Sequence, residues 1–150
     1  MGHHISAIIG RAPINEDNAA KFDLPFFNEN GFVIVALNPY HHDFWDEKLG
    51  YEYEKISDDL MDTKCTHFLA KEIGLKEFAI IYTDYFGGVG SQTAVAYTDE
   101  IQTMPPTDDG ICKALNIIGV NRNWSQDEFD VIGLGKYRHW DGLFEKYEDL

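Results

Sequence analysis

Two pairs of neighbouring histidines are the residues with the clearest metal-binding chemistry. His3-His4 is the first pair, and His41-His42 is the second, with Asp43 directly after it. Zinc sites typically show two ligands at a helix or knuckle spacing and then a second such pair, which these positions do not match. Because neighbouring side chains of a strand point to opposite faces, each pair offers at most one ligand. We therefore expect no metal centre, and the candidate ligands, should one exist, are His3, His41, His42 and Asp43.

Asp84 is the carboxylate best placed for acid–base catalysis. It lies at the end of an apolar run, between Tyr82 and Tyr85. Acid–base catalysis needs a second group with a matched pKa in the same cleft, and the sequence names no such partner. The alternative is that Asp84 faces solvent or caps the loop that follows it. The chain also has no Gly-x-Ser-x-Gly motif for a nucleophilic serine, so we prefer a binding protein to an enzyme.

The loop Gly87-Gly88-Val89-Gly90-Ser91 has the composition of a phosphate-binding loop. A P-loop would need Lys and then Ser or Thr after the last glycine, and a dinucleotide fingerprint would need glycine at position 93, where Thr93 stands. We therefore predict a β-hairpin loop whose glycines adopt positive φ. The residues expected to line a ligand site beside it are Tyr85, Phe86, Gly87 and Gly88.

An acidic stretch with interleaved aromatic residues is the feature that points most directly to a partner. Residues 41–64 contain eight acidic residues and three lysines. Aromatic anchors within an acidic field suit a basic protein, because the charge speeds the encounter and the rings supply binding energy. The alternative is a solvated face whose rings point inward. The candidate binding residues are Phe44, Trp45, Asp46, Glu47, Tyr51, Glu52 and Tyr53.

Charge and composition restrict the class of partner. The 150 residues carry a formal net charge of −14, which disfavours nucleic acid and anionic membrane surfaces as partners. The longest apolar run, residues 32–37, is far shorter than the roughly 20 residues that span a bilayer. The two cysteines, Cys65 and Cys112, are expected to be buried free thiols, although Cys65 and His67 form a third possible ligand pair. We expect a cytoplasmic protein without a cofactor.

The pattern of elements predicts an α+β fold in a single domain of residues 1–150. Continuous apolar residues at 32–37 indicate a strand covered on both faces. Residues 40–56 show no clear periodicity, so we predict a loop there that includes one helical turn and one short strand. Helix starts are expected after Ser57, Thr107 and Ser125, and Pro105-Pro106 should break the chain. The expected sheet is mostly antiparallel, with strands near 5–9, 32–37, 78–85 and 91–98. The expected helices lie near 58–73, 108–118, 126–132 and 139–148, mainly on one face of the sheet.

Three functional hypotheses follow. The first is a binding domain that neutralises a basic protein; in charge and size the chain is similar to the immunity proteins that block bacterial nuclease toxins, a likeness that transfers no residue. The second is an enzyme, metal-dependent or cofactor-free, that uses the histidine pairs or Asp84. The third is a small-molecule-binding oligomeric module in which a hairpin edge pairs with a second copy of the chain.

Overall fold

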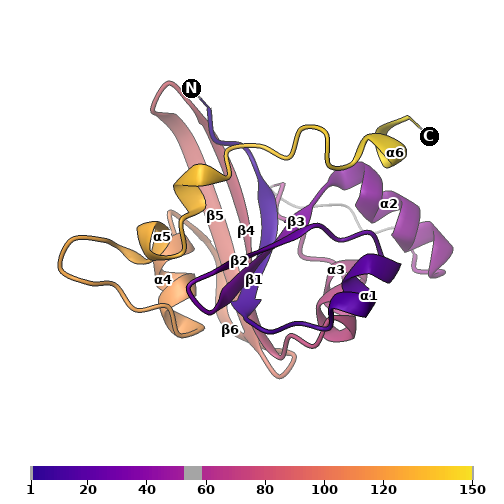
Figure 1. The fold of residues 1–150 in the computed structure, drawn as a ribbon, viewed down its shortest axis with the longest axis horizontal. Coiled ribbons are helices and arrows are strands. Elements are labelled where there is room, and N and C mark those ends of the chain that lie inside the picture. The colour runs from indigo at the N-terminus through magenta and orange to yellow at the C-terminus, as the bar shows by residue number, and fades with distance from the viewer. Residues whose placement is uncertain (1, 53–58, 150) are drawn as a thin grey trace.

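Six antiparallel strands form one sheet in the computed structural model, which describes residues 2–52 and 59–149 (Figure 1). The strands are arranged in the order β2-β3-β1-β4-β5-β6. This arrangement confirms the predicted α+β class and the mostly antiparallel sheet. The strand bounds are β1 Ser6–Arg11, β2 Phe26–Glu29, β3 Phe32–Leu37, β4 Glu77–Phe86, β5 Val89–Thr98 and β6 Ile101–Asp108.

The central strands are apolar on both faces, and both faces are covered. All six residues of β3 are buried, as their continuous apolar run predicts. Ile8 of β1 lies between Val35 and Ile80 and faces one hydrophobic cluster, whereas its neighbour Ile9 faces the other. Side chains alternate along a strand, so each strand contributes to two cores.

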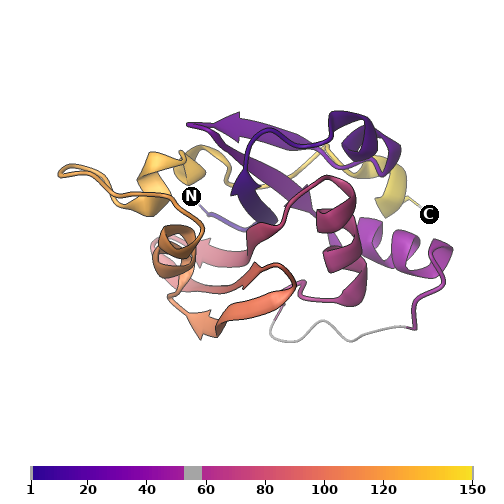
Figure 2. The same cartoon turned by 90° about the horizontal axis from the view of Figure 1, so that it is seen from below.

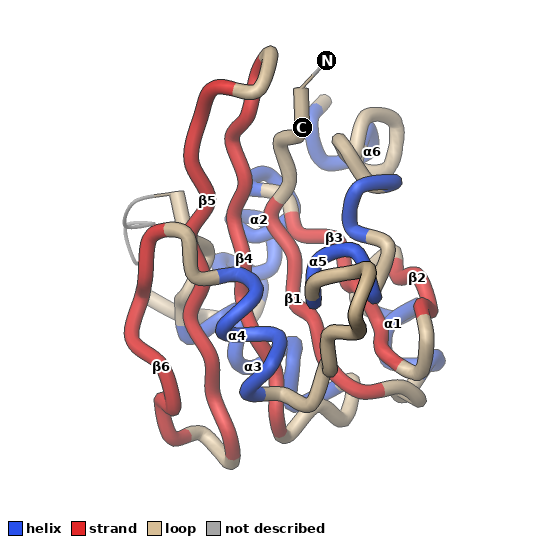
Figure 3. The backbone as a smooth tube through the Cα atoms, turned by 90° about the vertical axis from the view of Figure 1, so that its left-hand side faces the viewer, coloured by secondary structure: helices blue, strands red, loops and turns tan. Residues whose placement is uncertain are grey.

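Helices pack on both faces of the sheet, so the expectation of helices mainly on one face is wrong. In Figure 3, α4 and α5 lie in front of the strands, and α2 and α3 lie behind them. Figure 2 shows α2 and α3 next to each other from below. The helix bounds are α1 Glu16–Lys21, α2 Pro39–Lys48, α3 Lys64–Glu72, α4 Ile111–Ile117, α5 Glu128–Val131 and α6 Glu145–Glu148, with a 3₁₀ turn over Leu134–Lys136. None of the helices in the described ranges combines the length and apolarity needed to cross a bilayer.

Helix α2 occupies much of a segment that was expected to be a loop with no more than one helical turn. The Asn38 side chain caps it by accepting from the backbone N–H groups of Tyr40, at 2.8 Å, and His41, at 3.3 Å. Pro39 follows at the first helical position, which its fixed φ favours. The periodicity is hidden because the buried face of α2 includes polar residues, His42 and Asp46 among them.

Helix α3 begins later than the predicted position near residue 58. Asp59 has a φ of 60°, which is incompatible with a helix passing through it. Thr63 caps the helix instead and accepts from the backbone N–H of Thr66 at 3.3 Å. The predicted cap, Ser57, lies outside the described residues.

The segment around Pro105-Pro106 continues as strand β6 and does not break the chain there. Proline lacks an N–H donor, but β6 is an edge strand, where one side of the backbone needs no partner. Helix α4 consequently starts at Ile111 and has no side-chain cap, in contrast to the expected start after Thr107. Strand β2 was also not predicted; it forms a hairpin with β3 through Asn30-Gly31.

The C-terminal helices are shorter than predicted. Asp127, rather than Ser125, caps α5 by accepting from the backbone N–H of Asp130 at 3.0 Å. Asn123 accepts from the N–H of Ser125, so the expected capping box does not form. Only Glu145–Glu148 of the predicted segment 139–148 is α-helical.

Candidate functional site

A groove of about 540 Å³ opens where three strands of the sheet meet the C-terminal segment. The start of β1, the end of β3, the middle of β4, the segment before α3 and helix α6 all reach it. Segments far apart in the sequence therefore build it. We call it the acidic groove, lined by His4, Ile5, Ser6, Leu37, Asn38, Pro39, Asp59, Met61, Tyr82, His139, Trp140, Asp141 and Glu148.

Three exposed carboxylates give the acidic groove its charge. They belong to Asp59, Asp141 and Glu148. No lysine or arginine is among its described lining residues, and the only other ionisable groups there are His4, His139 and Tyr82. A concave surface lined by one sign of charge attracts ligands of the opposite sign, so the acidic groove favours a cationic group.

Tyr82 lines the acidic groove and is held as a neutral phenol. Burial, followed by the nearby carboxylates of Asp59 and Asp84, raises the pKa of Tyr82 to about 12. Its hydroxyl lies 3.4 Å from Nε2 of His4, and the two rings meet edge to face with centroids 5.6 Å apart. The groove thus combines negative charge with an aromatic surface, the two features that bind guanidinium and ammonium groups.

The wall of the acidic groove is fixed by hydrogen bonds from the C-terminal segment. Nε1 of Trp140 donates to the backbone oxygen of Ser6 at 2.8 Å, and the indole stacks on Phe27 with an interplanar angle of 8°. Farther along, the hydroxyl of Tyr147 donates to Asp23, and this hydrogen bond is the largest cause that lowers the pKa of Asp23. These contacts hold Asp141 and Glu148 in place at the groove.

The hairpin of β4 and β5 extends beyond the sheet next to the N-terminal segment, as Figure 1 shows. Gly87 and Gly88 form its two-residue turn with φ values of 61° and 81°, so the predicted hairpin loop is confirmed. Phe86 and Val89 flank this turn and are 82% and 79% exposed. Tyr85 is half-buried.

The candidate acid–base residue Asp84 is exposed on β4. It contributes charge next to Tyr82, but no hydrogen bond or ion pair within the described ranges joins its side chain to an imidazole. The structure therefore places Asp84 beside the acidic groove as a source of negative charge, without a partner for proton transfer.

The acidic–aromatic stretch points its rings largely inward. Trp45 is buried against Phe22 with ring centroids 5.1 Å apart, and Asp46 is 6% exposed, so neither is accessible to a partner in this conformation.

Phe44 is half-buried and packs against Tyr147. The side chains that do reach the surface are those of Asp43, Glu47 and Glu52, with Tyr51 half-buried. Tyr53 lies outside the described residues.

The histidines proposed as metal ligands are engaged in separate structural contacts. His3 bonds through its two ring nitrogens to Thr83 Oγ1, at 2.7 Å, and to the backbone oxygen of Leu134, at 2.9 Å. His41 is buried, and its Nε2 lies 2.7 Å from the backbone oxygen of Phe22. The predicted set of His3, His41, His42 and Asp43 is therefore not assembled as one centre.

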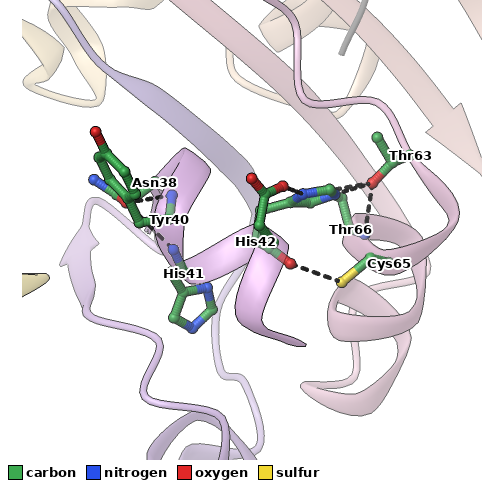
Figure 4. A network of polar contacts seen from close by, with 8 residues as sticks. Asn38, Tyr40, His41, His42, Thr63, Cys65 and Thr66 are labelled. Carbon is green, nitrogen blue, oxygen red and sulfur yellow. Dashed lines mark hydrogen bonds and ion pairs between the residues drawn. The ribbon is translucent and has the colours of Figure 1, made fainter. Parts of the chain in front are cut away.

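His42 lies at the centre of a buried polar network between α2 and α3 (Figure 4). Its Nδ1 is 3.1 Å from an oxygen of Asp43, and its Nε2 is 2.7 Å from Oγ1 of Thr63. The Cys65 thiol points to the backbone oxygen of His42 at 3.9 Å. Burial, followed by the charges of Asp46 and Asp43, raises the pKa of Cys65 to about 12, so the thiol is protonated at neutral pH.

A second cluster of ionisable side chains lies on the other side of α3. Asp62 is 2.6 Å from Nε2 of His67 and accepts from the hydroxyl of Tyr97 at 2.5 Å. His67 and Lys71 line two adjoining clefts of about 460 and 510 Å³. An imidazole oriented by a carboxylate can transfer protons. Sequence reasoning missed this group because Asp62 and Tyr97 are far apart in the chain.

The buried His41 predicts a loss of stability in mild acid. Burial is the main cause that lowers the pKa of His41 below its ordinary value of 6.5. Below about pH 6.5 the unfolded chain therefore binds a proton that the folded chain does not, and the free energy of unfolding falls as the pH falls toward the folded-state pKa. One such proton contributes a slope of at most about 1.4 kcal/mol per pH unit.

Replacing His41 by glutamine should reduce this slope, because the amide keeps a donor for the Phe22 oxygen but does not titrate. The measurement is urea unfolding of the wild-type chain and His41→Gln between pH 7 and pH 5. Parallel pH dependences in the two proteins would contradict the assignment of the slope to His41.

No family model matches the chain, and neither a curated protein nor a solved structure matches it.

Proposed function

We propose that the chain is a binding domain that recognises a basic protein through the acidic groove. The single observation that carries this proposal is the groove lining: Asp59, Asp141 and Glu148 line it together with the half-buried Tyr82, without a lysine or arginine among the described lining residues. The net charge of −14 acts in the same direction, because it accelerates the encounter with a positively charged partner.

An arginine or lysine of the partner is the group that suits the acidic groove. Its charge would be neutralised by the surrounding carboxylates, and its side chain would pack on the ring of Tyr82. Arginine fits better than lysine, because its planar guanidinium can bond two carboxylates at once and stack on an aromatic ring. A row of such side chains on a basic protein would also reach Asp84.

The tip of the β4–β5 hairpin supplies the apolar contact in this proposal. The exposed rings and methyl groups of Phe86 and Val89 lie on the hairpin whose strand β4 also carries Tyr82. Charged groups steer association, whereas buried apolar anchors slow dissociation. The two features together describe an interface with an electrostatic part and an apolar part.

Capture at two salt concentrations tests the proposal. The immobilised chain is incubated with lysate at about 0.05 M and about 0.5 M salt, where surface charges are weakly and strongly screened, respectively. Captured proteins are identified, purified and titrated against the free chain. We expect a basic protein that binds at a defined stoichiometry with a Kd at least tenfold higher at the higher salt concentration. A purified partner that is acidic, or one whose Kd does not change with salt, would contradict the proposal.

A further inference from the structure

We propose that His42, Asp46 and Cys65 form a binding site for a zinc-class divalent cation, independent of the acidic groove. One donor atom from each residue, an imidazole nitrogen, a carboxylate oxygen and the thiol sulfur, lies within 4.8 Å of the other two. All three residues are buried. Nitrogen, oxygen and sulfur donors together are the ligands that zinc prefers.

The local structure brings these donors together from two helices. His42 and Asp46 are four residues apart on α2, so they share one face of that helix. Cys65 is near the beginning of α3, which packs against α2. In a tetrahedral zinc site, bonds of about 2.0–2.3 Å place neighbouring donors about 3.5 Å apart. The donors would therefore need to approach by about 1 Å, a shift that side-chain rotation can provide.

Asp46 contributes the negative charge among the three donors. Its residue exposure is only 6%, yet none of the hydrogen bonds within residues 2–52 and 59–149 involves its side-chain oxygens. Largely buried charges in proteins are generally paired or coordinate metals. A cation at this position would compensate the negative charge of Asp46, which the neutral Cys65 thiol does not.

The surrounding network supplies the supporting contacts that metal ligands normally have. His42 makes two hydrogen bonds, one with Asp43 and one with Thr63. A cation would replace one of them, and the remaining bond would fix the orientation of the ring, as second-shell partners of metal-bound histidines do. The thiol proton would be released to solvent, and a water molecule would complete the fourth position. The thiolate and imidazole donors select zinc or cobalt over magnesium or calcium.

Titration of the full chain with Co²⁺ as a spectroscopic substitute for Zn²⁺ tests the site. After treatment with a chelator, the protein should bind one Co²⁺ and show the near-ultraviolet charge-transfer band of a cobalt–thiolate bond, and one equivalent of Zn²⁺ should remove that band. Cys65→Ser should abolish the band, whereas His42→Gln and Asp46→Asn should each raise the Kd at least tenfold. Circular dichroism establishes that each variant is folded.

Cys112→Ser is the matched control, because Cys112 is the other free cysteine and lies on α4, away from α2 and α3. This variant should retain the full band. The titration of the wild-type chain requires no substitution, so it shows whether Co²⁺ binds through a thiolate even if a variant fails to fold. Binding without a thiolate band, a band that Cys112→Ser removes, or no binding at all would overturn the proposal.

Discussion

Removing the three acids of the acidic groove should lower the association rate constant for the basic partner at least tenfold at low salt. In the variant D59N/D141N/E148Q, each carboxylate becomes the amide of the same shape, so the change in the groove is mainly one of charge. Asparagine also tolerates the left-handed backbone of Asp59, whose φ is 60°. Electrostatic steering accounts for factors of about 10–10³ in association rates, and it depends on charges near the binding surface. Stopped-flow association at several salt concentrations measures the effect.

A variant with three equally exposed acids replaced elsewhere separates the acidic groove from net charge alone. E16Q/D17N/D130N removes the same charge from α1 and α5, at positions that do not line the groove. Its association rate constant should fall by less than about threefold, since distant charges are screened beyond roughly 10 Å at 0.1 M salt. Equal losses in the two variants would show that only the total charge matters, which would refute recognition through this groove.

Replacing Gly90 by alanine should destabilise the β4–β5 hairpin more than any other single methyl group added to the exposed surface. A Cβ atom at this position would lie 1.9 Å from the backbone oxygen of Asp84 and 2.7 Å from the Cα of Tyr85. Neither atom belongs to a flexible side chain, so the two strands must separate locally. We expect a loss of about 3 kcal/mol in the free energy of unfolding. The tip carrying Phe86 should be displaced at the same time.

The matched control for this prediction is Gly135→Ala. Gly135 is exposed, has an ordinary φ, and a Cβ built on it meets no atom within 4 Å. This substitution should leave stability unchanged or raise it slightly, because alanine reduces the conformational freedom of the unfolded chain. Urea unfolding of both variants gives the comparison. Equal stability of Gly90→Ala and the wild-type chain would be inconsistent with the close contact between the hairpin strands.

Strands β1, β3, β4 and β5 were predictable from the sequence because their apolar residues form continuous or alternating runs, whereas β2 and β6 were not. The run from Phe32 to Leu37 lies on a strand covered on both faces, as expected. Helix α2 was not predictable in the same way. Its buried face contains the polar residues His41, His42 and Asp46, so the apolar residues of the sequence do not show a helical repeat. The signal that remained was Asn38-Pro39, a cap followed by a residue suited to the first turn.

The site was less predictable than the fold, because its residues are brought together by tertiary structure. His4, Asp59 and Glu148 belong to three distant segments, and no local spacing relates them. Local composition instead pointed to Trp45, whose indole fills the core between α1 and α2. The kind of partner expected from the net charge stays a prediction. Which aromatic residues reach the surface was decided by burial, which depends on the phase of the helix.

The two prolines of β6 have a consequence for how the protein behaves at high concentration. An incoming strand extends a sheet by pairing with the N–H and C=O groups along the open border. Neither Pro105 nor Pro106 has an N–H, and because successive N–H groups of a strand point to opposite sides, one of the two missing donors would have faced this border. Strand addition is therefore disfavoured along this border, although Ile101 beside it is 69% exposed. Pro105 and Pro106, which were expected to break the chain, thus make self-association through this edge of the sheet less favourable.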